Sequence, residues 1–332
     1  MSTIREAKMI RPARQALKWL AGPVIAGSLV LGLPAAAQAQ VHAAKDSTAA
    51  IQTLLNNPVN GVVNLPSGTF TISPTLQLQQ GEIIIGHGTT LQVAASAGNY
   101  AAVLTGTTVS TDLSGLQIKG VTFDQNSSGD PIANVQALSN GNFRFVILVS
   151  KGANISITND SFLNTNNVNT IVTGSATSNV TISHNIFTGI STPWHDHSSI
   201  YTSGTGATIS NNTFTGSHDI TAIEVHGNLA SVTGNTVSGY YRGINIVCNN
   251  TTFSGNTIKG ALNPVDLWSI VAPGLHDVTV TNNTLNQNLS DWARYLPTVR
   301  IPMPPTQALQ QVVEQSTSTY PFTAITVSGN HG

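Results

Sequence analysis

A varied set of side chains that could transfer a proton or bind a charge at a site falls between residues 193 and 268. The segment Pro193-Trp194-His195-Asp196-His197 comes first, followed by Tyr201, Glu224, His226, Tyr241, Arg242, Asp266 and Trp268. Histidines and carboxylates are common general acids and bases, and aromatic rings commonly line ligand-binding grooves. We therefore expect a functional site in this region, on a fold that brings these dispersed segments together.

The spacing of apolar residues predicts how the segments meet. Each lies in a short run of alternating apolar and polar residues, the pattern of a half-buried strand. The predicted inward positions are Ile200, Ile223, Ile244 and Val265, and their outward neighbours are Tyr201, Glu224, Asn245 and Asp266. Stacked strands lie about 4.8 Å apart, so these outward residues become neighbours. We expect the substrate to be bound by Trp194, Tyr241, Asn245 and Trp268.

Elimination is one reaction that these residues could catalyse. A base removes the proton next to a uronate carboxylate, while a cation neutralises that carboxylate. The candidate bases are His195, His197 and His226. Tyr201 is the candidate acid and Arg242 the candidate cation.

Two further reactions need carboxylates at this site. Inverting hydrolysis requires a pair of carboxylates with room for water between them. Glu224 and Asp266 lie two predicted strands apart, roughly 9.6 Å, and Asp196 is a second candidate partner of Glu224. Uronan epimerisation is the other alternative, using the same carboxylates.

A divalent metal is a separate hypothesis for the same residues. Residues two apart on a strand share a face, so His195, His197, Glu224 and His226 could converge as ligands. A set of histidines with one carboxylate suits zinc or manganese better than calcium.

A repeated phrase predicts the fold itself. Strand-like segments such as "VTISHN", "ATISNN", "TTFSGN" and "VTVTNN" recur, each ending in a turn. The aligned turn residues are Asp160, Asn185, Asn212, Asn235, Asn256, Asn283 and Asn330. Most copies are 21 to 27 residues apart, a period typical of solenoids. We expect an all-β, right-handed parallel β-helix in which the asparagines stack into a ladder of side-chain amides.

The first 39 residues read as a secretory signal peptide. Five basic residues precede an apolar run from Leu20 to Leu33 and the small-residue segment Ala37-Gln38-Ala39. This predicts a secreted or periplasmic protein, with residues 40–332 as a single β-helix domain and no membrane insertion after cleavage.

Charge and cysteine content exclude other classes. Removing the leader takes five of 13 Lys and Arg and one of 14 Asp and Glu, which leaves 8 against 13 and a net charge near −5. An acidic chain does not favour nucleic acid as a partner. Cys248 is the single cysteine, so no intrachain disulfide is available.

Both ends of the predicted solenoid need covering. A helix over Asp46–Leu55, with Ile51, Leu54 and Leu55 on one face, could cap the first strands. Near the other end the repeat lapses at about 287–322, where several prolines are incompatible with a central strand. We expect a loop and short helix there, which either bring Trp292, Arg294 and Arg300 toward the substrate or cover a sheet edge.

The opening "DSTAAIQTLLNNPVNGVVNLPSGTFTIS" and "LQLQQGEIIIGHGTTL" resembles the pectate-lyase-like β-helix superfamily, and the later copies resemble its parallel β-helix repeats. The resemblance covers nearly all of residues 45–330. It implies a polysaccharide substrate and a lyase-like activity, while the superfamily also includes hydrolases, epimerases and non-enzymatic adhesins. The segment Pro193-Trp194-His195-Asp196 is similar to the Asp-Pro-His-Asp of mannuronan epimerases, with Trp194 as a departure.

Overall fold

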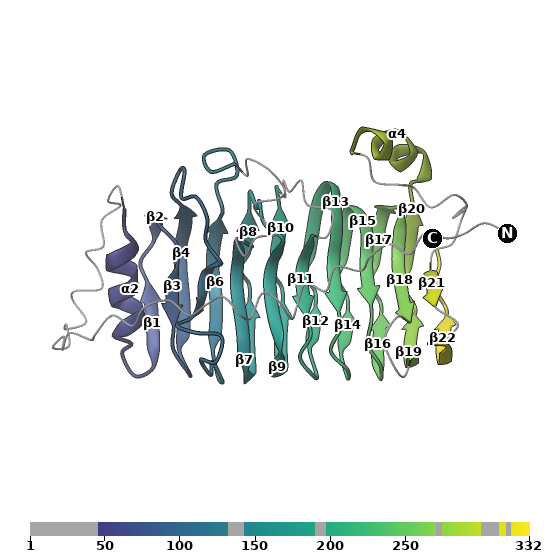
Figure 1. Ribbon diagram of the computed structural model, residues 1–332, viewed down its shortest axis with the longest axis horizontal. Helices are drawn as coiled ribbons and strands as arrows, with labels where there is room; N and C mark the ends of the chain where they lie inside the picture. Colours follow the sequence, from purple (N-terminus) through teal and green to yellow (C-terminus); the bar gives the residue numbers. More distant parts are fainter. Residues whose placement is uncertain (1–45, 132–142, 190–196, 270–273, 300–311, 317–319) are drawn as a thin grey trace.

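The protein is a parallel β-helix, elongated along the axis on which its strands stack (Figure 1). The structure, a computed structural model, describes residues 46–131, 143–189, 197–269, 274–299, 312–316 and 320–332, and only the backbone of 295–299 and 313–316. The predicted signal peptide lies outside the described residues. Among those described, no helix is long and apolar enough to cross a membrane.

Three ladders of parallel strands run along the solenoid, and long strands bend from one ladder into the next. The first ladder contains β1 (Val62–Leu65), β4 (Ile83–Val93), β6 (Gln117–Asp124), β7 (Phe145–Thr158), β9 (Asn169–Ser183), β12 (Thr208–Ser210), β14 (Ser231–Thr233), β16 (Thr251–Ser254), β19 (Leu275–Thr281) and β22 (Phe322–Ser328). The second joins parts of β4 and β6 to β2 (Gly68–Ile72), β8 (Ser161–Leu163), β10 (Ile186–Thr188), β13 (Thr213–Val225), β15 (Thr236–Ile246), β17 (Thr257–Ala261) and β20 (Thr284–Gln287).

The third ladder carries the region predicted to be functional. It joins parts of β7, β9, β13 and β15 to β3 (Leu76–Leu78), β5 (Ala102–Gly106), β11 (Ser198–Thr202), β18 (Asn263–Ser269) and β21 (Val312–Ser316). Its register pairs Ile200 with Ile223, then Ile244, then Val265, all fully buried. The prediction of equivalent positions is therefore confirmed, and the outward row Tyr201, Glu224, Asn245 and Asp266 follows from it.

The core is a stack of inward apolar side chains that repeats from rung to rung. Phe123, Phe162, Phe187 and Phe214 stack with successive centroid distances of 5.3, 4.8 and 4.6 Å. Tyr240 ends this row edge-on to Phe214 at 6.2 Å. Burying one such side chain stabilises the fold by roughly 1.5–3 kcal/mol, so the repeated row is a large source of stability.

The predicted asparagine ladder is confirmed. The Nδ2 of each asparagine donates to the Oδ1 of the next, at 2.8 to 3.0 Å from Asn185 through Asn212, Asn235, Asn256 and Asn283 to Asn330. Each Nδ2 also donates to a backbone carbonyl of the preceding rung, as Asn185 does to Ile157 at 2.9 Å. The ladder therefore satisfies buried backbone groups at every turn.

The N-terminal cap is also present. Helix α2 (Thr48–Asn56) buries Ile51, Leu54 and Leu55 as predicted. Its first turn is capped by Asp46, whose Oδ1 accepts from the backbone and hydroxyl of Thr48 at 2.8 and 2.5 Å, rather than by the side chain of Ser47.

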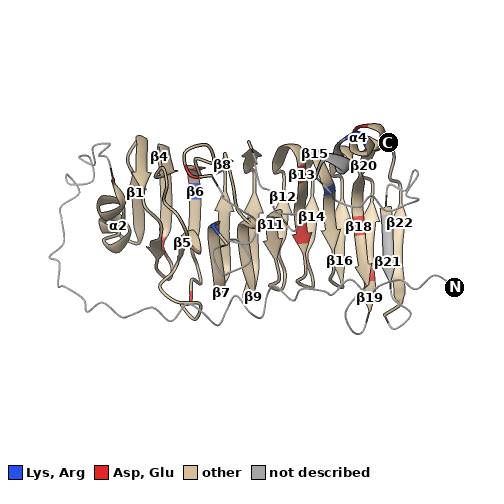
Figure 2. Cartoon of the chain, turned by 45° about the horizontal axis from the view of Figure 1, so that its top comes forward, with Lys and Arg blue, Asp and Glu red and all other residues tan. Residues whose placement is uncertain are grey.

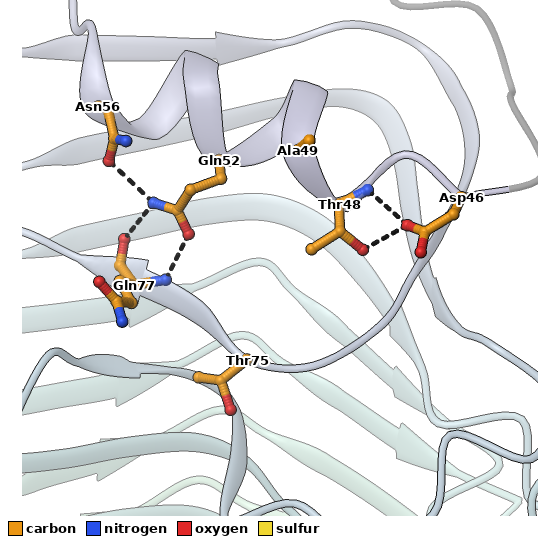
Figure 3. Close-up of a pocket in the computed structure, with 7 residues that line it drawn as sticks. All are labelled: Asp46, Thr48, Ala49, Gln52, Asn56, Thr75 and Gln77. Atoms are coloured by element: carbon orange, nitrogen blue, oxygen red, sulfur yellow. Dashed lines mark hydrogen bonds between the residues drawn. The ribbon is translucent and has the colours of Figure 1, made fainter. Parts of the chain in front are cut away.

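A polar depression lies between α2 and β3 (Figure 3). There the side-chain amide of Gln52 bonds the backbone N–H and C=O of Gln77 at 2.7 and 3.0 Å. The helix thus supplies bonds that another strand would otherwise make. Asp46 is the only ionisable residue lining this depression, so it holds no acid–base pair.

Near the C-terminal end, the predicted insertion contains helix α4 (Leu289–Val299) and strand β21. Figure 1 shows α4 standing above β17, β18 and β20, on the side of the solenoid rather than over its end. The expectation of a short helix is confirmed, and the same stretch contains strand β21, which extends the third ladder.

Asp160 begins the ladder with a carboxyl where the later rungs have an amide. Its Oδ1 accepts from the backbone N–H of Val121 at 2.8 Å, whereas Oδ2 has no hydrogen-bond partner among the described residues. Burial raises the pKa of Asp160 to about 7, although backbone hydrogen bonds act in the opposite direction.

Replacing Asp160 with Asn should therefore stabilise the protein at alkaline pH. Since the folded-state pKa is raised from 3.8 to about 7, the parent loses stability as the pH rises through this interval. The gain of Asp160→Asn should grow from almost nothing near pH 4 to the order of 4 kcal/mol near pH 8. Denaturant unfolding across this pH range measures it, with the exposed Asp277→Asn as control. Equal stability of parent and variant at alkaline pH would contradict this role for Asp160.

Candidate functional site

The outward side of the third ladder brings charged and aromatic residues together on a surface with few charges. Figure 2 shows how sparse acidic and basic positions are along the solenoid, with acidic positions on β13 and β18 of this ladder. Strands β11, β13, β15 and β18 place Tyr201, Glu224, Arg242 and Asp266 on consecutive rungs. A β surface needs no such residues for solubility when serine and threonine occupy most outward positions, so this concentration indicates a site.

A carboxylate and an imidazole form the centre of the candidate site. The Nε2 of His226 lies 2.7 Å from Oε1 of Glu224, and the hydroxyl of Ser198 donates to Oε2 at 2.5 Å. The ring of Tyr201 lies 4.9 Å from that of His226, tilted by 34°. Both centre residues are reachable from solvent, with 14% of the Glu224 side chain and 29% of the His226 side chain exposed.

The environment of Glu224 favours its ionised form. Burial alone would raise the pKa of this carboxyl, but the hydrogen bond and charge of His226, the hydrogen bond from Ser198 and the charge of Arg242 together hold it below the ordinary value of 4.5. Glu224 is therefore a carboxylate at neutral pH, and a carboxylate can only accept hydrogen bonds. In the neutral ring, the proton of His226 consequently lies on Nε2, which leaves Nδ1 with its lone pair available.

Arg242 is held beside this centre by two rings and a carboxylate. Its Nε donates to Oδ2 of Asp266 at 3.0 Å, and its guanidinium lies 5.1 Å from the ring centroid of Tyr241 and 4.9 Å from that of Trp268. Its Nη atoms make no hydrogen bond to any residue that the structure describes. The guanidinium can therefore offer these two nitrogens to an anionic group of a ligand.

The structure does not support Asp266 as a catalytic partner of Glu224. The Asp266 side chain is completely buried, and its Oδ2 accepts from Asn263 at 3.3 Å as well as from Arg242. Both contacts are made by Oδ2, and because the side chain is completely buried, no oxygen of Asp266 faces solvent to activate water. The predicted hydrolytic pair is thereby reduced to Glu224 with Asp196, which lies outside the described residues along with Trp194 and His195.

Three other predicted site residues are buried rather than presented to a ligand. His197 is fully buried, with Nδ1 3.3 Å from the carbonyl of Asn167 and Nε2 3.4 Å from Ser199, and burial lowers its pKa to about 4. Tyr241 and Asn245 are 5% and 1% exposed. His197 was a predicted base and metal ligand, but at the entry to β11 its ring turns into the interior. Trp268 remains partly exposed.

The predicted metal ligands are only partly together. Glu224 and His226 are in contact, whereas His197 is turned inward and His195 is outside the described residues. Within the described ranges, no group of three His, Cys, Asp or Glu is arranged to hold a metal ion.

Sequence reasoning missed Ser198 and the pairing of Arg242 with Asp266. Ser198 begins β11 in register with Thr221, whereas the register partner of Glu224 is Tyr201. The register pairs Arg242 with Asn263 and Asn245 with Asp266. Each contact therefore joins residues three positions out of register, and an alignment of the strands gives no signal for either of them.

Removing the Ser198 hydroxyl should raise the pKa of Glu224 and destabilise the protein. Ser198→Ala loses a hydrogen bond to a charged group, worth roughly 1.5–3 kcal/mol. Because the lowered pKa of Glu224 contributes stability above its unfolded-state value of 4.5, the deficit should be largest near neutral pH and shrink on acidification. Carboxyl NMR titration and unfolding curves test this, with Ser203→Ala, which removes a neutral hydrogen bond, as control. An unchanged Glu224 titration would refute it.

Comparison with known proteins identifies the fold's relatives. Tailspike protein mutants of E. coli bacteriophage HK620 match in structure. One in complex with a pentasaccharide is 18% identical, with a TM-score of 0.59, over 73% of this chain and 46% of its own. One in complex with a hexasaccharide is 15% identical, with a TM-score of 0.62, over 85% and 52%. The chain thus spans about half the length of these tailspikes, and at such identity the likeness concerns the fold.

The sequence comparison is more specific. No curated protein matches the chain. A family model described as "Rhamnogalacturonase A/epimerase, pectate lyase-like" matches residues 39–266, which is more than half of the sequence and includes Glu224, His226 and Arg242. The chain therefore belongs to the Rhamnogalacturonase A/epimerase, pectate lyase-like family.

Proposed function

We propose that this protein is an exported enzyme that acts on a polysaccharide at the outward face around Glu224, by an elimination that His226 initiates. The observation that carries the proposal is the 2.7 Å contact between Glu224 and His226. A carboxylate that accepts from Nε2 orients the imidazole and leaves Nδ1 as the base. Export rests on the predicted signal peptide.

The reaction uses three groups of this face. Nδ1 of His226 takes the proton next to a sugar carboxylate, and the electrons of the broken C–H bond form a carbon–carbon double bond. The glycosidic C–O bond breaks, and the leaving oxygen takes a proton from the hydroxyl of Tyr201. Arg242 neutralises the charge that develops on the carboxylate, since its Nη atoms are available for a paired contact.

Family membership and the tailspike complexes favour a saccharide ligand. The tailspike structures with a similar fold contain a pentasaccharide or a hexasaccharide. The partly exposed ring of Trp268 beside Arg242 offers an apolar surface of the kind that ligand grooves use. Elimination is favoured over hydrolysis because Asp266 is committed to Arg242.

The decisive experiment incubates the purified protein with a panel of acidic and neutral polysaccharides, reading unsaturated sugar absorbance and new reducing ends together. Elimination predicts both signals, and reducing ends alone would mean hydrolysis with Glu224 and Asp196. Loss of activity in chelator, restored by zinc or manganese, would add a metal ion at Glu224 and His226. Binding without turnover across the panel would reject an enzyme in favour of a saccharide-binding protein.

On the substrate found, Glu224→Gln and His226→Ala should each lower kcat by roughly 10²–10⁴-fold. The matched control is His276→Ala, since His276 and Asp277 form a second imidazole–carboxylate contact at 2.8 Å on an exposed surface away from the third ladder. This control should keep full activity. Activity in His226→Ala close to that of the parent would exclude His226 as the base.

A further inference from the structure

Trp292 lies on α4, outside the segment that matches the family model, yet it is fully buried. Its Nε1 donates to the carbonyl of Gly260 at 2.8 Å, and its ring meets Tyr241 edge-on at 5.6 Å and 84°. Tyr241, Leu262 and Trp292 form a small apolar cluster separate from the main core. The predicted approach of Trp292 to a ligand is therefore wrong, because its side chain is enclosed by the solenoid wall.

The cluster is joined directly to the candidate site. Tyr241 contacts Trp292 with one part of its surface, and its ring also lies 5.1 Å from the guanidinium of Arg242. Trp268 contacts the same guanidinium at 4.9 Å, and Asp266 fixes its Nε. A continuous row of contacts thus runs from α4 to the cation beside Glu224.

We infer that α4 is a positioning element of the site, in which Trp292 holds Tyr241 against Arg242 and so fixes the direction of the guanidinium. A long arginine side chain loses considerable rotamer entropy when it is ordered. One ion pair through Nε leaves rotation about the other bonds, whereas rings at two sides of the guanidinium restrict it. Trp292 supports the ring that Arg242 contacts without touching Arg242 or a ligand itself.

The inference rests on the proposed function in one respect only: the benefit of fixing Arg242 is that its Nη atoms are placed to bind the sugar carboxylate. The positional claim concerns the protein without any saccharide, and can be tested in that state. Failure to find a substrate would therefore refute the proposed function and not the positional claim, which the NMR experiment below tests by itself.

The test is NMR of the isotope-labelled protein, observing the Nε–H of Arg242, which the contact with Asp266 should make sharp and slow to exchange with solvent. Trp292→Ala should accelerate this exchange roughly two- to thirtyfold, the range expected for weakening one cation–π contact. Trp292→Phe, which retains a ring, should restore the slow exchange. Ser290→Ala is the matched control on the same helix, because it removes a 3.1 Å bond to Asn288 at the start of the helix.

A second pair of variants keeps the claim decidable if Trp292→Ala does not fold. Tyr241→Phe should preserve the slow Nε–H of Arg242, and Tyr241→Leu should lose it, with the amide signals of the asparagine ladder unchanged in both. The inference is overturned if folded Trp292→Ala lowers the melting temperature but leaves Arg242 exchange as in the parent, which is what a purely structural role predicts. It is equally overturned if Trp292→Phe behaves as Trp292→Ala.

Discussion

The parallel register of the rungs is the constraint on which the rest of the structure depends. The asparagine ladder and the inward apolar rows enforce it together. A slip of one residue would turn every inward side chain outward and leave buried amides without partners, at roughly 1–3 kcal/mol for each unmade bond. Since Tyr201, Glu224 and Arg242 are contributed by different rungs, their distances depend on that register.

A surface of serine, threonine and asparagine allows the few charged residues to act at short range. Burial raises the pKa of Glu224, and its own partners His226, Ser198 and Arg242 lower it to below the ordinary value. Partial burial strengthens these contacts. The exposed His276–Asp277 pair differs from the candidate site in this respect. The same chemical groups meet there, but no contact among the described residues adds a second charged partner or an aromatic ring.

The two carboxylates of this face, Glu224 and Asp266, have different roles because they differ in burial. Glu224 keeps some exposure and orients an imidazole, whereas Asp266 is enclosed and fixes a guanidinium. A buried carboxylate that lost its cation would be left as an uncompensated charge. Asp266 therefore keeps Arg242 paired and fixes its position. The contacts through Tyr241 to Trp292 extend that support to a helix far along the chain.

The sequence by itself determined the solenoid, because the repeat period, the alternation of apolar residues and the turn asparagines are local properties that each copy restates. It also determined the neighbours Tyr201, Glu224, Asn245 and Asp266, since register follows from that alternation. Only the tertiary structure decided that His197 turns inward, that Arg242 pairs with Asp266, and that Trp292 packs against Tyr241. Those outcomes depend on strand entries and on an insertion without a repeat, where no periodic pattern fixes the direction of a side chain.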